Sequence, residues 1–389
     1  MKPTYNHSII STIMSILNYY GDTPNYQTNK KIDEYLKIKP RNVILLVLDG
    51  MGYDFLKKYF PSSSLFTHTI DKVTSTFPPT TTAAIKSYMS GLTPLEHGWL
   101  GWCPYFEKEN MHIELLPYKD ASTGQRPLLS YDIRDDLQFT TIFERIHRVN
   151  KNIDLHTNEH SYIKEEISYA NNHSYDTLEE MFDNLEKIIS NGKHNFIYCY
   201  HDNPDALMHE HGPSSPVVQK QFKKIISYID KFIEKNINSD SLLIISADHG
   251  QIDVEKYIDV QEDKILMNMI KTYPSIEPRF TSFILKEKEQ SKEFEKHFLK
   301  NYGSDFFLFN KDEFLKSGYL GKGNIQKEVS YLLGDYVALG KSKAMFINGK
   351  SEFVMKGHHA GTLHEEMVVP IIMFALKHNS IYNDVGDLK

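Results

Sequence analysis

Aspartate and histidine residues gather at four places in the sequence, each beside an apolar run with the composition of a β-strand. Taken singly, each place has the simpler interpretation of a turn or a helix cap. Carboxylates and imidazoles need partners once they are buried, so four such places together predict one shared site. Mixed Asp and His ligands suit Zn²⁺, or Mn²⁺ as the harder alternative, and suit Mg²⁺ poorly. The residues are Asp49, Asp205, His209, Asp248, His249, His358 and His359.

A threonine-rich segment, STFPPTTTAAIKSYMSG at residues 75–91, supplies a candidate nucleophile. Two prolines lead into successive threonines, and residues 83–90 then predict a short helix that Gly91 ends. A hydroxyl at a helix N-terminus lies beside unpaired N–H groups that can hold a phosphoryl group. The segment therefore indicates an anion site with its own nucleophile, although a plain helix cap also needs one threonine. The candidates are Thr80, Thr81 and Thr82.

These residues need a framework that brings their places together, and the apolar runs predict one. Residues 42–48, 195–200 and 242–246 are short runs typical of strands buried in a parallel sheet. Residues 217–237, which lie between the runs at residues 195–200 and 242–246, have apolar residues at helical spacing. This order of strand, helix and strand predicts a right-handed crossover unit. We expect an α/β fold with a doubly wound, mostly parallel sheet flanked by helices. Ligands of such sheets bind outside the carboxyl ends of the strands.

Other segments extend this framework. Apolar residues at helical spacing predict helices at residues 141–149 and 176–190, and an amphipathic helix at residues 9–17. A last strand is expected at residues 368–376, where Pro370 favours an edge position in the sheet.

The chain, residues 1–389, is expected to form one domain with a smaller insertion. The segment of residues 250–357 is longer than one crossover connection requires, and it contains a charged amphipathic segment at residues 286–301. We expect a small α+β lobe at approximately residues 260–355, which should help to select the substrate.

The composition limits the partners and the compartment. Lys and Arg number 44 against 51 Asp and Glu, so no basic excess favours a stable nucleic-acid partner. No apolar run approaches the roughly 20 residues that span a bilayer, and no membrane association is expected. The two cysteines, Cys103 and Cys199, cannot form a disulfide framework, and the N-terminus lacks a clear signal peptide. We therefore expect a cytoplasmic protein, and its oligomeric state is not indicated.

Six motifs in the chain resemble, in order and approximate spacing, those of the type I phosphodiesterase and nucleotide pyrophosphatase family of the alkaline phosphatase superfamily. The resemblance extends over about residues 40–376. It implies an alkaline phosphatase-like fold and a two-metal hydrolase that acts on a small phosphate ester or nucleotide through a phosphorylated threonine. The motifs are VLDGMG, the threonine segment, LTPLEHGWLGW, PDALMHEHGP, ADHG and GHHAGTLHEEMVVPII.

The resemblance also implies residue roles. Counting ten residues back from Gly91, as the family pattern does, makes Thr81 the nucleophile. The ligand histidine of GHHAGT becomes His359 instead of His358, with Ala360 in place of a family glycine. One metal would be held by Asp49, Asp248, His249 and Thr81, and the other by Asp205, His209 and His359.

The sequence departs from the family at Trp102, where many nucleotide-cleaving relatives have an asparagine that helps to hold the phosphate. Trp99 and Trp102 could instead contact the substrate by stacking on a base or enclosing an apolar leaving group. They could equally be core aromatic residues. Two alternatives to a phosphodiesterase remain open: a phosphomonoesterase or phosphonate (C–P) hydrolase on the same scaffold, and a non-catalytic, metal-stabilised binding protein.

Overall fold

A computed structural model of the chain describes residues 1–161, 166–349 and 354–377. Its main body is built on a seven-stranded sheet with the strand order β2-β18-β9-β1-β8-β6-β7. All of these strands run parallel except β18, which is antiparallel to both neighbours, so the predicted α/β sheet is confirmed. The strands are β1 (Asn42–Leu48), β2 (Thr69–Thr74), β6 (Ile153–His160), β7 (Asn171–Tyr175), β8 (His194–His201), β9 (Ser241–Ser246) and β18 (Val368–Leu376).

The central strand β1 explains why the site residues meet. Every residue of β1 is buried, as expected for a strand covered on both faces. In register, Leu48 lies opposite His201 of β8, and Val47 lies opposite Ser246 of β9. The three strands therefore end at nearly the same level, and the residues that follow them emerge side by side.

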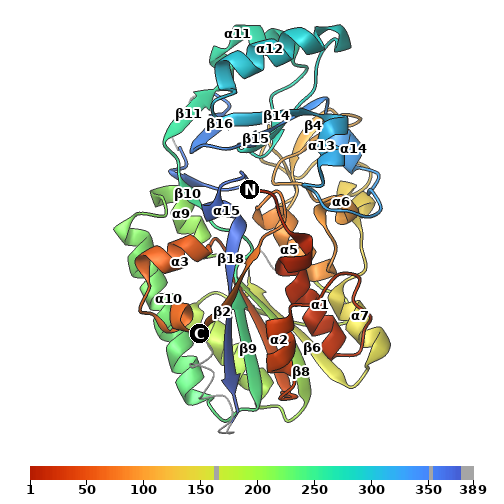
Figure 1. Ribbon diagram of the computed structural model, residues 1–389. Coiled ribbons are helices and arrows are strands. Elements are labelled where there is room, and N and C mark those ends of the chain that lie inside the picture. Colours follow the sequence, from red (N-terminus) through yellow and green to blue (C-terminus); the bar gives the residue numbers. More distant parts are fainter. Residues whose placement is uncertain (162–165, 350–353, 378–389) are drawn as a thin grey trace.

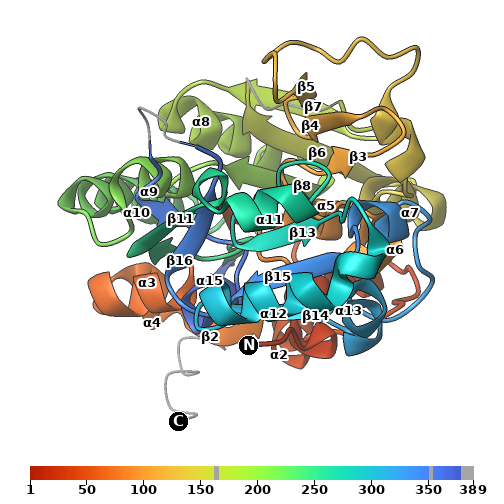
Figure 2. The same ribbon diagram turned by 90° about the horizontal axis from the view of Figure 1, so that it is seen from above.

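Helices cover both faces of the sheet, as Figures 1 and 2 show from two directions. One layer contains α1 (Ile9–Tyr19), α2 (Lys30–Leu36), α5 (Thr81–Ser90) and α7 (Ile142–Val149). The other contains α3 (Tyr53–Tyr59), α4 (Ser64–Thr67), α8 (Leu178–Ile189), α9 (Asp205–His211) and α10 (Pro216–Lys235). The helices predicted at residues 83–90, 141–149, 176–190 and 217–237 are confirmed.

The N-terminal helix α1 forms where predicted, but it is not amphipathic in its surroundings. All of its residues from Ile9 to Leu17 are buried, because α1 packs against α2, α5 and α7. Two of its hydroxyl side chains have partners inside the fold: the Ser11 hydroxyl donates to the Ser8 carbonyl, and the Ser15 hydroxyl donates to the Asn29 carbonyl. In the sequence, the short hydroxyl side chains of α1 look like the polar face of a surface helix, but in the fold they are buried.

Strand β18 is not at the edge of the sheet, so that prediction was wrong. β2 pairs with its outer side, and Pro370 lies opposite Lys72 of β2. Pairing with β9 begins only at Ile372, after a register shift between Ile371 and Ile372. The proline is tolerated because it precedes the part of β18 that bonds to β9.

A second group of strands and helices lies over the carboxyl ends of the parallel strands (Figure 1). It contains a four-stranded sheet with the order β12-β13-β15-β14 and a parallel pair, β11 and β16. The strands are β11 (Lys256–Asp259), β12 (Ser275–Ile276), β13 (Phe280–Phe283), β14 (Phe306–Asn310), β15 (Tyr336–Gly340) and β16 (Ala344–Ile347). The helices are α11 (Lys264–Met269), α12 (Ser291–Tyr302), α13 (Lys311–Ser317) and α14 (Val329–Leu332).

These elements fall in the segment where the inserted lobe is predicted, of which residues 350–353 lie outside the described part. The division into a domain and a lobe stays a prediction, and we call residues 256–347 the lobe. A three-stranded sheet from an earlier part of the chain adjoins it, since Cys103 forms a β-bridge with Ile276. The remaining elements are β3 (Tyr105–Phe106), β4 (Met111–Glu114), β5 (Lys119–Asp120), β10 (Ile252–Asp253), β17 (Gly357–His358), α6 (Pro94–His97) and α15 (His364–Met367).

Across the described residues, no helix combines the length and the apolar composition that crossing a bilayer requires.

Candidate active site

The predicted Asp and His residues meet at the carboxyl ends of the strands. Asp49 directly follows β1, Asp248 and His249 follow β9, and Asp205 begins α9 after β8. His359 follows the short strand β17. These five side chains are buried, and His209, which joins them from α9, is partly buried.

One cluster consists of Asp49, Asp248 and His249. The His249 Nε2 lies 3.3 Å from Asp49 Oδ1 and 3.3 Å from Asp248 Oδ2. Both carboxylate oxygens are buried and have no hydrogen-bond partner within the described ranges. A buried carboxylate oxygen without a donor is costly, so this arrangement fits a bound cation.

A second cluster consists of Asp205, His209 and His359. Asp205 Oδ2 lies 3.2 Å from His209 Nε2, and Asp205 Oδ1 lies 3.9 Å from His359 Nε2. His249 also lies near this cluster, because one ligand atom each of Asp205, His249 and His359 lie within 4.8 Å of one another. The two clusters are therefore adjacent. His358 is absent from both metal-ligand groups found among the described residues, so the geometry favours His359.

Backbone carbonyls orient the three histidines of the clusters. Nδ1 of His209 lies 3.0 Å from the Gly357 carbonyl oxygen, and Nδ1 of His249 lies 3.1 Å from that of Gly250. Nδ1 of His359 lies 3.1 Å from the Pro79 carbonyl oxygen. A proton on each Nδ1 leaves Nε2 as an acceptor toward the cluster, which is the usual arrangement of a metal-bound histidine.

Gly50 allows the two aspartate-bearing loops to approach closely. It has a φ of +74°, and a Cβ at this position would lie 2.9 Å from the Asp205 Cβ. The Asp205 backbone N–H donates to the Asp49 carbonyl at 3.0 Å. The glycine of VLDGMG thus fixes the distance between the clusters, since any side chain there would displace α9.

The electrostatics of the clusters also fit a cation. Burial, together with the charges of Asp205 and Asp248, raises the pKa of Asp49 well above its usual value. Burial likewise raises the pKa of Asp248. Burial opposes ionisation of Asp205, but His209, His249 and the hydrogen bond from Gln251 together outweigh it and lower the pKa of Asp205 to about 2. Burial and the neighbouring histidines lower the pKa of His359 well below its usual value, so this imidazole is neutral and can act as a ligand.

The threonines differ in what they contact. Thr81 is the first residue of α5, and its hydroxyl lies 3.2 Å from Asp49 Oδ2 and 3.1 Å from His249 Nε2. Thr80 is the helix N-cap, yet its hydroxyl donates to Glu277 at 2.7 Å. Thr82 is fully buried and is not among the described residues that line the cavity. The geometry therefore favours Thr81 as the nucleophile.

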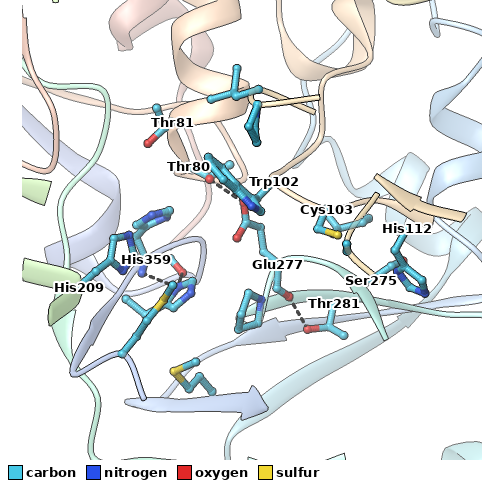
Figure 3. A pocket seen from close by; sticks show the side chains of 18 of the residues that line it. Thr80, Thr81, Trp102, Cys103, His112, His209, Ser275, Glu277, Thr281 and His359 are labelled. Carbon is cyan, nitrogen blue, oxygen red and sulfur yellow. Dashed lines mark hydrogen bonds between the residues drawn. The ribbon is translucent and has the colours of Figure 1, made fainter. Parts of the chain in front are cut away.

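A cavity of about 1180 Å³ joins the clusters to the lobe, and Figure 3 shows part of its lining. Trp102 lines this cavity and is 40% exposed. Trp99 is buried among apolar residues and is not among the described residues that line the cavity. Its indole N–H donates to the Leu137 carbonyl at 3.1 Å. Trp99 therefore lies in the core, which is the alternative that the sequence left open for it, and contact of Trp102 with substrate stays a prediction.

Three polar residues beside the clusters were missed from the sequence. The Tyr200 hydroxyl donates to Asp49, and the Gln251 amide donates to Asp205. Tyr200 is the last residue of the strand predicted at residues 195–200, where a polar atom could have been noticed. Glu277 of the lobe lines the cavity, and burial raises its pKa to about 7. It belongs to no motif, and only the folded lobe brings it to the site.

Comparison with known proteins gives the chain a family and a set of structural relatives. Residues 43–361 match the family model of type I phosphodiesterases and nucleotide pyrophosphatases. Two solved structures of murine ectonucleotide pyrophosphatase/phosphodiesterase 5, one an inactive variant in complex with AMP, each have a TM-score of 0.63. The human protein has a TM-score of 0.62. Each is 16% identical to this chain over 85% of its length and 87% of the other. Curated protein sequences gave no match.

The structural likeness confirms the alkaline phosphatase-like fold expected from the sequence. The family model covers most of the chain, from β1 to just beyond the last ligand candidate, His359. This protein therefore belongs to the type I phosphodiesterase and nucleotide pyrophosphatase family, whose metal-dependent members hydrolyse phosphoric esters.

Proposed function

We propose that this protein hydrolyses phosphodiesters with Thr81 as its nucleophile and two divalent metal ions held by six Asp and His residues. The observation that carries the proposal is the position of the Thr81 hydroxyl. It contacts both Asp49 and His249 while standing at the N-terminus of α5. A structural threonine at a helix start would need neither contact.

The metal ions, when bound, would lower the pKa of the nucleophile and neutralise charge on the phosphoryl oxygens. The hydroxyl of Thr81 loses its proton toward Asp49 and forms a bond to phosphorus. The bond from phosphorus to the leaving oxygen breaks, and this oxygen takes a proton from solvent, which releases an alcohol and leaves a phosphorylated Thr81. The N–H groups of the first turn of α5 hold the phosphoryl oxygens in place. Water then cleaves the bond between phosphorus and Thr81, yielding a phosphomonoester and restoring the hydroxyl.

The donor set supports two ions and favours zinc, with manganese as the alternative. Three carboxylates and three imidazoles divide into adjacent clusters, and imidazole is a preferred ligand of these metals. The buried oxygens Asp49 Oδ1 and Asp248 Oδ2, which have no donor among the described residues, would face the ion of their cluster.

A nucleotide or a similar phosphodiester is the substrate class that we propose. The cavity is large enough for a molecule of this size, and Trp102 offers an aromatic surface within it. The murine relative supports this choice, since its inactive variant, which replaces a threonine with alanine, holds AMP.

We also propose that the protein acts in the cytoplasm. Both Cys103 and Cys199 are free thiols, which suits a reducing compartment.

Replacing Thr81 tests the proposed function. The purified protein should contain about two metal ions per chain by elemental analysis and should hydrolyse bis-p-nitrophenyl phosphate. Thr81→Ala should keep the metal ions and lose at least about 10³-fold in kcat. Thr82→Ala, a change at the next and fully buried threonine, is the matched control and should stay near wild type. Activity of Thr81→Ala comparable to that of wild type would reject Thr81 as the nucleophile. A wild-type protein that binds metal but turns over no phosphate ester would favour a binding protein.

A further inference from the structure

The lobe places a carboxylate, Glu277, beside the nucleophile, and this residue has no role in the mechanism so far. Its side chain is 5% exposed and lines the cavity. Oε1 accepts hydrogen bonds from the Thr80 hydroxyl and from the Trp102 backbone N–H, each at 2.7 Å. Figure 3 shows the Glu277 carboxyl reaching toward Thr80, with a dashed line for the hydrogen bond between them.

The backbone around Glu277 holds this carboxylate in one place. Its N–H donates to the Phe280 carbonyl at 3.0 Å, and its own carbonyl accepts the Thr281 hydroxyl at 2.7 Å. The preceding residue, Ile276, has a φ of +79°, which is strained for a β-branched side chain. Two backbone hydrogen bonds with Cys103 hold Ile276 in that conformation. A strained residue that the surrounding structure holds in place is a common feature of functional sites.

Glu277 also changes what the start of α5 can bind. An N-cap threonine usually accepts a hydrogen bond from the first turn of its helix. Thr80 accepts no such bond, and its hydroxyl is directed at Glu277, to which it donates. The N–H groups of the first turn of α5 are thus left for an anion next to Thr81.

The same arrangement limits the charge of that anion. Glu277 and Thr81 line the same cavity, and the charges of His209 and His249 act on Glu277, so its carboxylate faces the space in which a phosphoryl group at Thr81 would lie. Burial raises the pKa of Glu277 to about 7, whereas the hydrogen bonds from Thr80 and Trp102 and the nearby His209 and His249 favour its ionised form, and metal ions at those histidines would act in the same direction. At the same distance, an ionised carboxylate repels a phosphoryl group with two negative charges more strongly than a phosphoryl group with one.

We propose that Glu277 is a specificity-determining residue that makes the site prefer phosphate esters with one negative charge, such as diesters, over doubly charged monoesters. It does so by fixing a carboxylate beside the phosphoryl group while withdrawing Thr80 from the cap of α5. This assignment rests on the proposed hydrolysis at Thr81. It names the residue that sets the charge selectivity of that reaction. A site can select one substrate by repelling its competitor as well as by attracting the substrate itself.

The test compares two esters with the same leaving group, bis-p-nitrophenyl phosphate and p-nitrophenyl phosphate, on the metal-loaded full chain. The assay is run at about pH 8.5, where the monoester, with a second pKa of about 6, is doubly charged. Glu277→Gln should raise the monoester-to-diester ratio of kcat/KM by about tenfold or more, because it removes the charge and keeps the shape. Glu277→Ala, a second neutral variant, should shift the ratio in the same direction.

Two variants separate the charge from the hydrogen bonds. Glu277→Asp keeps a carboxylate and should keep the diester preference. Thr80→Val removes the hydroxyl partner and leaves the charge, so it should keep the wild-type ratio even if both rates fall. The assignment is overturned if the neutral variants keep the wild-type ratio, or if Thr80→Val shifts the ratio as far as Glu277→Gln does. A metal-loaded wild type inactive on both esters would instead contradict the proposed function, and this assignment with it.

Discussion

The Arg279 guanidinium and the Glu366 carboxylate form a fully buried pair with two hydrogen bonds, from Nε to Oε1 at 2.7 Å and from Nη2 to Oε2 at 2.9 Å. Arg279 belongs to the lobe, and Glu366 belongs to α15, which precedes β18 of the main sheet. Glu366 also accepts the backbone N–H of Gly361, two residues after His359. The pair therefore connects the lobe with the loop that carries a candidate metal ligand.

Breaking this pair should destabilise the protein strongly. Arg279→Met leaves the Glu366 charge buried without its partner, and such a change typically costs ~3–5 kcal/mol of unfolding free energy. Denaturant unfolding followed by circular dichroism would measure the loss. Adding Glu366→Leu to that variant should recover part of it, because no uncompensated charge then remains. A single variant as stable as wild type would show that the two halves are held together by other contacts.

The two neighbouring histidines should differ in metal binding. His359 faces Asp205 and His249, whereas His358 is in neither cluster. His359→Ala should lose about one equivalent of metal per chain, since one ion loses a ligand. His358→Ala should keep the wild-type metal content. Elemental analysis of both purified variants checks this, and the reverse result would reassign the ligand.

Removing the metal ions should make the contribution of Asp49 to stability depend on pH. In the metal-free protein, the folded-state pKa of Asp49 is raised well above its unfolded value, mainly by burial. Such a group stabilises the fold fully below its unfolded pKa of about 4, and this contribution is lost as the pH rises through the folded pKa. Buried histidines such as His359, whose pKa is lowered, act in the opposite direction, but they do so in wild type and in Asp49→Asn alike. After chelation, the midpoint of thermal unfolding of wild type relative to that of Asp49→Asn should therefore be higher at pH 5 than at pH 8.

Metal addition and one substitution serve as controls for that experiment. Zinc should raise the midpoint most at pH 8, where the carboxylates are charged. Asp49→Asn is the reference in this comparison, because it removes the titrating group. A wild type whose midpoint relative to Asp49→Asn is unchanged or lower at pH 5 than at pH 8 would contradict the predicted repulsion among these carboxylates.

The framework of the fold could be predicted because its signals are local. The runs at residues 42–48 and 368–376 coincide with β1 and β18, since strands buried on both faces are continuously apolar. Because ligands of such sheets bind at strand ends, the sequence also predicts that Asp49, Asp205 and Asp248 lie together. This prediction succeeds because neighbouring strands in register end at one level.

What could not be predicted depends on contacts between distant segments. Nothing near Pro370 in sequence reveals that β2 covers the outer side of β18. Trp99 and Trp102 lie three residues apart in one motif, yet one is buried in the core and the other lines the cavity. Glu277 reaches Thr80 across a sequence separation of 197 residues. Such relationships are set by packing, which a single sequence does not display.

The stereochemical course at phosphorus tests the central claim most directly. A chiral phosphorothioate diester, hydrolysed in ¹⁸O-labelled water, reports whether the reaction uses one in-line displacement or two. Attack by Thr81 followed by attack of water inverts the configuration twice, so overall retention is expected. Overall inversion would mean that water attacks the substrate directly, and it would contradict the phosphorylated Thr81 intermediate.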